Sequence, residues 1–276
     1  MPKEPTKEEL LHKMHAETQD EVWRKILIEG DPMGKRMRHI FRALPANPRC
    51  AQCNVPFAGV GGMLATLIGA GKRSAKNPRF CDACMTFDTK VPGGAEVELS
   101  MMFVDVRGST SLAENMSALE FSRLMNRFYE VTINVLIKAD AFIDKLVGDE
   151  VTALFFPGYA GKEHAQKAVG AGKAVLHATG HADAGGPWVP VGVGVHTGIA
   201  WVGSIVGASG ASADFTALGD NVNIAARLAS KAGAGEILAS EATCRAAGLD
   251  MDSYEKRDLE LKGKSATVGV RVLKAS

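Results

Sequence analysis

The sequence predicts an α+β protein in which one antiparallel sheet, backed by helices, follows an N-terminal helix and a small cysteine-rich module. Beyond residue 96, patterns typical of strands and helices alternate in the order strand, helix, hairpin, helix, strand. This βαββαβ order favours an antiparallel sheet with helices packed against it. Before residue 90, two Cys-x-x-Cys pairs enclose a glycine-rich run, a spacing typical of a metal-bound unit. The length of 276 residues, with 46% hydrophobic and 23% charged, suits one or two globular domains.

Changes in composition divide the chain. Residues 8–28 place apolar side chains near one face and charges elsewhere, which predicts an amphipathic helix that needs a partner. The turn-rich KVPGGAE is a sensible domain boundary. We therefore expect an N-terminal helical segment (1–44), a four-cysteine metal-binding module (45–89), a linker (90–96) and the main domain (97–276).

The main domain shows its elements through periodicity. The uncharged stretch 184–213 is long enough to suggest a transmembrane helix, but its glycines alternate with Val and Ile, which instead predicts a buried hairpin. The full set of expected elements is strand 97–106, helix 118–138, strands 141–147 and 150–156, helix 163–180, hairpin 189–206, helix 219–231, strand 236–239 and strands 254–261 and 267–273.

Four of the five cysteines are paired by spacing. Cys50 and Cys53 form one pair and Cys81 and Cys84 the other, so that four thiolates could complete a tetrahedral metal centre. Zinc is the first choice, an iron–sulfur cluster is the alternative, and four unrelated reduced thiols are the third interpretation. Cys244 stands alone in a helical pattern and is predicted to be a small buried side chain.

Charge and the N-terminal residues bear on partners and location. A formal net charge of +1 gives no electrostatic reason to expect nucleic acid or a membrane as partner. The start of the chain, MPKEPTKEELLHK, has no apolar core of the kind that a signal peptide needs. The sequence therefore predicts a cytoplasmic protein.

Three short fragments carry candidate chemistry. Asp105 ends a buried strand, and Asp149 lies at a hairpin tip four residues after Lys145. If the sheet brings the two carboxylates together, they form a Mg²⁺ site of the kind used for nucleoside triphosphates. A helix cap at Asp105 and a plain turn at Asp149 are the simpler interpretations. Asn223 and Arg227 share a helical face, where they could orient a sugar and a phosphoryl group, or be an ordinary helix start and a solvated Arg.

Taken together, these fragments resemble the catalytic domain of class III nucleotidyl cyclases, from about Glu98 to the C-terminus. FVDVRGST is similar to the family's first metal strand, KLVGD to its hairpin, GVHTG to its central strand and LGDNVNIAARL to its transition-state helix, in the family's order and spacing. The resemblance implies a ferredoxin-like βαββαβ catalytic domain.

The resemblance also implies roles for individual residues. Asp105 and Asp149 would hold two Mg²⁺ or Mn²⁺ ions. Lys262 matches the triphosphate-binding lysine. The alternative is a solvated basic turn, and Lys264 is close enough to replace Lys262 as a point charge. The backbone that would cradle phosphate belongs to Val106, Arg107, Gly108, Ser109 and Thr110.

The positions that read the base are Lys145 and Thr216, while Asn223 would orient the ribose and Arg227 would stabilise the α-phosphate transition state. An ammonium at Lys145 suits the N1 acceptor of adenine, so ATP is favoured. Thr216 stands where many adenylate cyclases have Asp, and it resembles the bicarbonate-responsive subgroup. The hydroxyl can donate or accept a hydrogen bond, which leaves some guanylate activity conceivable.

The expected function is an adenylate cyclase that converts ATP to cyclic AMP and pyrophosphate at the interface of a homodimer, with the cysteine module in a structural or regulatory role. In this family, the metals and Arg227 of one site would come from opposite chains. The alternative is a degenerate cyclase-fold regulator that binds nucleotide or a partner without turnover. His196 is interpreted as a core or loop histidine, and His164, His177 and His181 as surface residues.

Overall fold

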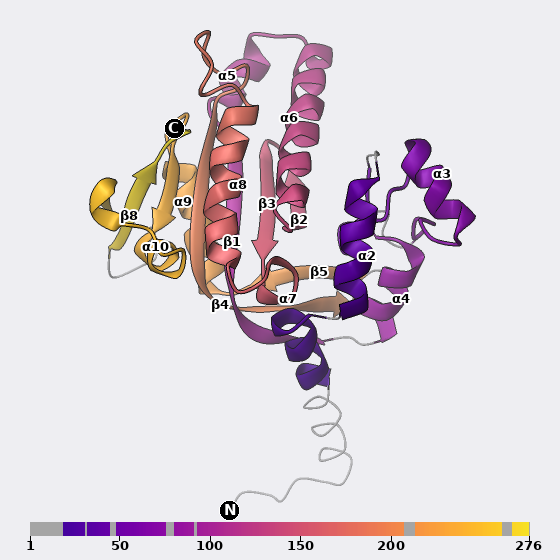
Figure 1. Ribbon diagram of the computed structural model, residues 1–276. Helices are drawn as coiled ribbons and strands as arrows, with labels where there is room; N and C mark the ends of the chain where they lie inside the picture. Colours follow the sequence, from indigo (N-terminus) through magenta and orange to yellow (C-terminus); the bar gives the residue numbers. More distant parts are fainter. Residues whose placement is uncertain are drawn as a thin grey trace, which may run out of the picture. The chain divides into compact units, whose positions relative to one another are not determined.

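A computed structural model describes residues 19–30, 32–44, 48–75, 80–90, 93–206, 213–260 and 267–275 (Figure 1). The chain forms two compact units. The smaller unit takes its residues from Met1–Val97 and Trp201–Ala217, and the larger unit from Glu98–Ala200 and Leu218–Ser276. Lys262, predicted to bind the triphosphate, and the nearby Lys264 lie outside the described residues.

Apart from the hairpin at 189–206, the expected elements occur in the predicted order with bounds within a few residues. The elements from residue 93 onward are β1 (Gly93–Val106), α5 (Ser109–Glu114), α6 (Ala118–Lys138), β2 (Phe142–Val147), β3 (Glu150–Phe155), α7 (Pro157–Ala160), α8 (His164–Ala178), β4 (Val191–Val206), β5 (Ala213–Leu218), α9 (Asp220–Lys231), β6 (Ile237–Ser240), α10 (Glu241–Ala246), a 3-10 turn (Met251–Ser253), β7 (Glu255–Leu259) and β8 (Val268–Leu273). The structure thus adds α5, α7, β5, α10 and the 3-10 turn to the expected elements.

The sheet is mixed, which corrects the expectation of a purely antiparallel sheet. Within the described residues its strand order is β2-β3-β1-β4-β6-β8-β7, with β5 paired to β4. The pairs β1–β3, β2–β3, β6–β8 and β7–β8 are antiparallel, but β4 and β6 are parallel. Parallel neighbours need a long crossover, and the segment containing β5 and α9 supplies it. The α+β class itself is confirmed.

The predicted hairpin at 189–206 is wrong, because this segment is the single 16-residue strand β4. A two-residue turn would need a backbone in the left-handed region, and neither Gly198 nor Gly203 in this segment has a positive φ. The alternation of glycine with Val and Ile correctly predicted strand structure. Alternation alone does not distinguish one long strand from two short ones.

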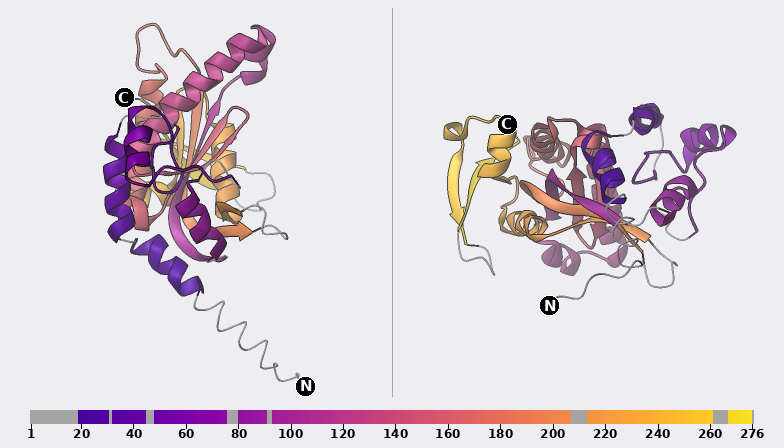
Figure 2. Two further views of the ribbon diagram at one scale, coloured as in Figure 1. Left: turned by 90° about the vertical axis from the view of Figure 1, so that its right-hand side faces the viewer. Right: turned by 90° about the horizontal axis from the view of Figure 1, so that it is seen from below.

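Helices cover both faces of the sheet in the larger unit (Figure 2). Residues of α6 and α8, such as Phe128 and Val175, pack with Val193 of β4 and Ile237 of β6 in the main core. On the opposite face, α9 packs against Leu238 of β6 and the inner residues of β8. Because neighbouring residues of a strand face opposite sides, the two cores share β6.

The smaller unit contains a helix over residues 19–28, followed by α2 (Pro32–Ala43), α3 (Gly59–Leu67) and α4 (Asp82–Lys90). The helix at 19–28 inserts Trp23, which is fully buried, against Phe215 of β5 with the ring centres 5.5 Å apart. This contact supplies the partner that the amphipathic pattern required. Within the described part of the chain, we find no helix with the length and apolarity needed to cross a membrane.

Candidate active site and cysteine cluster

The end of β1 lies beside the hairpin between β2 and β3. In the antiparallel pair β1–β3, Asp105 is opposite Glu150. The backbone N–H of Val106 donates to the carbonyl oxygen of Asp149 at 3.1 Å. The sheet register therefore places the backbone of Asp149 beside the end of β1, which carries Asp105, and the charge of Asp149 acts on the Asp105 carboxyl group.

Negative charge is concentrated at this point. Partial burial raises the pKa of Asp105, the adjacent Arg107 guanidinium opposes this effect, and the charge of Asp149 adds to it. Burial, together with the charges of Asp105 and Asp149, raises the pKa of Glu150 to about 7. Carboxylate oxygens are the ligands that Mg²⁺ and Mn²⁺ prefer, and a bound cation would relieve the mutual repulsion. These residues therefore fit a divalent metal site.

Arg107 connects the carboxylates to α9. Its guanidinium forms an ion pair with Asp105 and also donates to the carbonyl oxygen of Ser230 at 3.1 Å. The hydroxyl of Ser230 in turn donates to the carbonyl oxygen of Arg227 at 2.8 Å. The end of β1 is thereby joined to the helix that carries Asn223 and Arg227.

The structure reduces the number of backbone amides that could bind phosphate. The amides of Val106 and Arg107 donate to the carbonyl oxygens of Asp149 and Pro190, at 3.1 and 2.8 Å, so they are already engaged. Gly108 adopts the left-handed conformation, with φ of 68°, and leads into α5 at Ser109. The first amides of a helix have no partner within the helix. The amides from Gly108 to Thr110 thus remain the candidates for phosphate.

Two residues near the hairpin were missed by the sequence analysis. Tyr129, on α6, donates its hydroxyl hydrogen to the carbonyl oxygen of Gly148 and so holds the hairpin tip beside Asp149. Burial, followed by the charge of Asp149, raises the pKa of the Tyr129 phenol. Glu150 could have been noticed from its place in the GDE triplet. Nothing in the sequence indicates that Tyr129 reaches the hairpin, because that contact depends on how α6 packs.

The two predicted base-reading residues belong to different units. Lys145, in the larger unit, lies half-buried on β2 opposite Thr152, next to an irregularity in the β2–β3 register after Ile143. Thr216, in the smaller unit, lies on β5 and is 3% exposed. Each is therefore placed within its own unit, and their roles remain predictions.

Asn223 and Arg227 lie on α9 as expected, with Asn223 exposed and Arg227 half-buried. This helix sits unusually close to β4. A Cβ added to Gly194 would lie 2.2 Å from the amide nitrogen of Ala229, and one added to Gly192 would lie 2.8 Å from the carbonyl oxygen of Ala232. The alternate glycines in VGVGVHTG therefore allow backbone contact between the strand and the helix.

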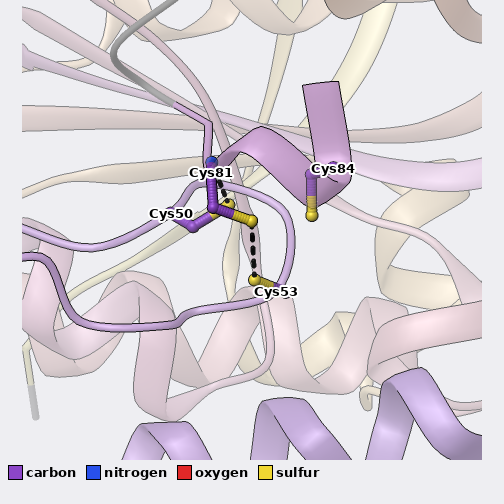
Figure 3. Close-up of side chains that lie close together, drawn as sticks. All are labelled: Cys50, Cys53, Cys81 and Cys84. Carbon is purple, nitrogen blue, oxygen red and sulfur yellow. Dashed lines mark hydrogen bonds between the residues drawn. The ribbon is translucent and has the colours of Figure 1, made fainter. Parts of the chain in front are cut away.

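The four paired cysteines come together in the smaller unit (Figure 3). Their sulfur atoms all lie within 4.8 Å of one another, and the Sγ atoms of Cys53 and Cys81 are 3.7 Å apart. A tetrahedral zinc site with Zn–S bonds of about 2.3 Å places its sulfurs about 3.8 Å apart. The geometry and the donor atoms of Cys50, Cys53, Cys81 and Cys84 thus fit a tetrahedral metal.

A backbone turn holds the first cysteine pair, and a hydrogen bond joins the second pair to it. Cys50 and Val55 are joined by a hydrogen bond from the amide of Cys50 to the carbonyl oxygen of Val55 at 2.9 Å, and Asn54 completes the turn with φ of 62°. The second pair begins just before α4, where the amide of Cys81 donates to the Sγ of Cys50 at 3.3 Å. Amides that donate to sulfur favour the thiolate form, which is the form that binds metals.

The first turn is also tied to α2. Arg49 donates to the carbonyl oxygen of Phe41 at 2.7 Å and contacts that of Leu44. Arg38, buried on α2, donates to the carbonyl oxygen of Gln52 inside the turn. The cysteine cluster therefore holds α2 as well as its own loops.

Residues 94–273 match the family model described as "Adenylate and Guanylate cyclase catalytic domain". The chain belongs to this family of class III cyclases. It is 27% identical over 197 residues to an adenylate cyclase of Anabaena cylindrica. That match covers 64% of this chain and 37% of the Anabaena protein, so the chain corresponds to only part of that longer relative.

Solved structures agree with this assignment. The guanylyl cyclase Cya2 superposes with a TM-score of 0.59 at 25% identity, over 65% of this chain and 93% of that one. The adenylyl cyclase CyaB from P. aeruginosa superposes with a TM-score of 0.56 at 29% identity, over 66% of this chain and 97% of that one. The cyclase catalytic fold is therefore shown for the main domain.

The cysteine cluster gives the first testable prediction. Cys81→Ser should release one equivalent of metal and make residues 45–88 sensitive to protease, because metal binding of roughly 10 kcal/mol or more is the main source of folding free energy for so small a unit. Metal analysis, absorption spectroscopy and limited proteolysis measure this. Cys244→Ala, which changes a cysteine buried in the main core of the larger unit, is the matched control and should keep the metal.

A colourless protein with stoichiometric zinc would identify a structural site, whereas visible absorption that bleaches on oxidation or reduction would identify an iron–sulfur cluster. Protein with no metal and four freely titrating thiols would contradict both.

Proposed function

We propose that the protein is an adenylate cyclase that converts ATP to 3′,5′-cyclic AMP and pyrophosphate. The observation that supports this proposal is the presence of Asp105 at the end of the buried strand β1 and of Asp149 in the adjacent β2–β3 hairpin, where its carbonyl oxygen accepts from the amide of Val106. The family to which the chain belongs uses divalent metals at its catalytic domain. A relative and a structural neighbour are both named as adenylate cyclases, which supports the choice of product.

The reaction exchanges one bond for another. The ribose 3′-hydroxyl gives its proton to water, its oxygen attacks the α-phosphorus, and the bond from that phosphorus to the bridging oxygen of the β-phosphate breaks, so pyrophosphate leaves. Two Mg²⁺ or Mn²⁺ ions, held by Asp105 and Asp149, would lower the pKa of the 3′-hydroxyl and neutralise the triphosphate. Asn223 would orient the ribose, and Arg227 would donate to the α-phosphate as negative charge develops there.

The choice of base rests on Lys145 and Thr216. The ammonium of Lys145 donates hydrogen bonds and cannot accept them, so it suits the N1 acceptor of adenine and not the N1–H of guanine. The hydroxyl of Thr216 can serve either base. GTP is therefore the second candidate substrate, and the similarity to the guanylyl cyclase Cya2 supports this alternative.

We further propose a homodimer in which each active site takes its carboxylates from one chain and Asn223 and Arg227 from the other. Cyclase domains of this family usually dimerise. In the larger unit, Ile199 at 59% and Leu218 at 48% are exposed apolar side chains. A second copy that covered them would remove this apolar surface from water.

The central test removes one carboxylate at a time. Asp105→Asn or Asp149→Asn should lower kcat with Mg²⁺ or Mn²⁺ by about 10³-fold or more, because several kcal/mol of charge stabilisation are lost. The measurement is cyclic AMP formation, with circular dichroism to confirm the fold. Asp252→Asn, at an exposed position in the 3-10 turn, is the matched control. Wild-type activity in either active-site variant would contradict the two-metal assignment.

Specificity tests Lys145. Lys145→Glu should lower kcat/KM for ATP by about 10²-fold relative to GTP, because a carboxylate repels the N1 lone pair of adenine and accepts from the N1–H of guanine. Lys162→Glu, at an exposed position, controls for the change of charge. Equal losses for both nucleotides would mean that Lys145 does not read the base.

Mixing experiments test the shared site. Asp105→Asn and Arg227→Ala chains should each be inactive but regain activity when mixed, because one of the two sites in the heterodimer then has every residue intact. A mixture of Asp105→Asn with Asp149→Asn should stay inactive, since each of its sites lacks one carboxylate. If the first mixture also stays inactive despite demonstrated heterodimers, each chain builds its own site.

A further inference from the structure

His196 lies on β4 in the row of residues that faces α9. Because side chains alternate along a strand, it shares a face with Gly194 and Gly198, whose nearest neighbours belong to α9. The imidazole is 7% exposed. It is therefore a buried polar group at the contact between the central strand and the helix that carries Asn223 and Arg227.

Both ring nitrogens of His196 have partners. Nε2 lies 2.9 Å from Oδ1 of Asn221, and Nδ1 lies 2.8 Å from Oγ of Ser240. Nδ2 of Asn221 donates to the carbonyl oxygen of Ile199 at 2.8 Å, so its Oδ1 faces the ring and accepts. The imidazole thus carries its hydrogen on Nε2 and accepts from Ser240 at Nδ1. With both nitrogens engaged, His196 is not available as a general base.

Asn221 fastens the first turn of α9. Gly219, which precedes the helix, provides no side-chain cap. The Asn221 amide instead bonds both to the backbone of β4, at Ile199, and to His196. A Cβ at Gly198 would lie only 2.7 Å from Cγ of Asn221, so the amide lies directly against the strand. The Asn221 side chain therefore joins the start of α9 to β4.

A network of buried polar side chains, which begins at Ser240, holds the His196 ring in position. Oγ of Ser240 accepts from the amide of Thr243 at 3.1 Å, and the hydroxyl of Thr197 donates to that of Thr243 at 3.1 Å. Thr197 contacts Ser100 at 2.7 Å, and Ser100 contacts Nδ1 of His164 at 3.0 Å. His164 is buried, which corrects its expected surface position, and burial lowers its pKa.

We propose that His196 is a positioning residue that acts through Asn221 to fix the direction in which α9 presents Asn223 and Arg227 to the nucleotide. Asn221 lies two residues before Asn223 and six before Arg227 on one continuous helix. Rotation or sliding of the first turn would move both side chains together. This inference rests on the proposed cyclase function.

Two substitutions of His196 separate its hydrogen bonds. In His196→Gln, the amide nitrogen reaches the place of Nε2 and can still donate to Asn221. In His196→Asn, the shorter amide reaches only the place of Nδ1, so the bond to Asn221 is lost while Ser240 keeps a partner. Asn221→Ala removes the same bond from the other side. His177→Asn, on the exposed face of α8, is the control.

His196→Asn should lower kcat by about 10²-fold, the cost expected when reacting groups are misplaced by about 1 Å. KM for ATP should change little, because Asn223 and Arg227 act mainly in the transition state. His196→Gln should retain most of the activity. The double variant His196→Asn/Asn221→Ala should be no worse than Asn221→Ala alone, because Asn221→Ala already removes the bond to His196 as well as the bond to Ile199.

Hydrogen exchange of the full-length protein supplies a readout that does not depend on activity. Amides of residues 220–231 should exchange faster in His196→Asn and Asn221→Ala but not in His196→Gln or His177→Asn. Equal loss of kcat in the Gln and Asn variants, or unchanged exchange of α9 in the Asn variant, would overturn the proposal. If the wild-type protein makes no cyclic nucleotide, the proposed function fails and the catalytic part of this inference fails with it, whereas the exchange data still decide whether His196 anchors α9.

Discussion

The close approach of α9 to β4 is the constraint on which the candidate active site depends. Gly192 and Gly194 have no side chains to separate the helix from the strand, so the two backbones meet. Interiors are packed as densely as organic crystals, and a helix seated in this way has few positions open to it. The direction in which α9 presents Asn223 and Arg227, the candidate substrate-binding residues, therefore depends on a contact that neither of them makes.

The acidic residues at the end of β1 differ from the α9–β4 contact, because their interaction with one another is repulsive. Asp105, Asp149 and Glu150 are held together by sheet register and by the Tyr129 contact to the hairpin, although their charges oppose it. Local arrangements that oppose stability are expected at functional sites, where the rest of the fold compensates. Arg107 provides part of that compensation by pairing with Asp105. Packing elsewhere in the sheet thus holds these acidic residues in place against their mutual repulsion.

How far the sequence predicts the structure depends on whether a feature is local. The helix at 118–138 was predicted with the bounds of α6, whose start is fixed by a capping box between Ser117 and Glu120. The pairing of cysteines was also readable, because two short spacings define the cluster. The sequence did not predict the single strand β4 or its parallel pairing with β6. Alternation of glycine with apolar residues indicates a strand but not where the strand turns or which strand it pairs with. The buried position of His164 and the contacts of Asn221 depend on partners from distant elements, so residue type alone could not reveal them.

Because side chains alternate along β5, two neighbouring residues of this short strand face opposite sides. Phe215 is buried against Trp23 of the N-terminal helix, and the next residue, Thr216, points to the opposite face. A movement of the helix that displaced Phe215 would tilt the strand and shift the hydroxyl that the proposed function assigns to the base. Any change in the packing of that helix would therefore reach the residue that the proposed function assigns to the base.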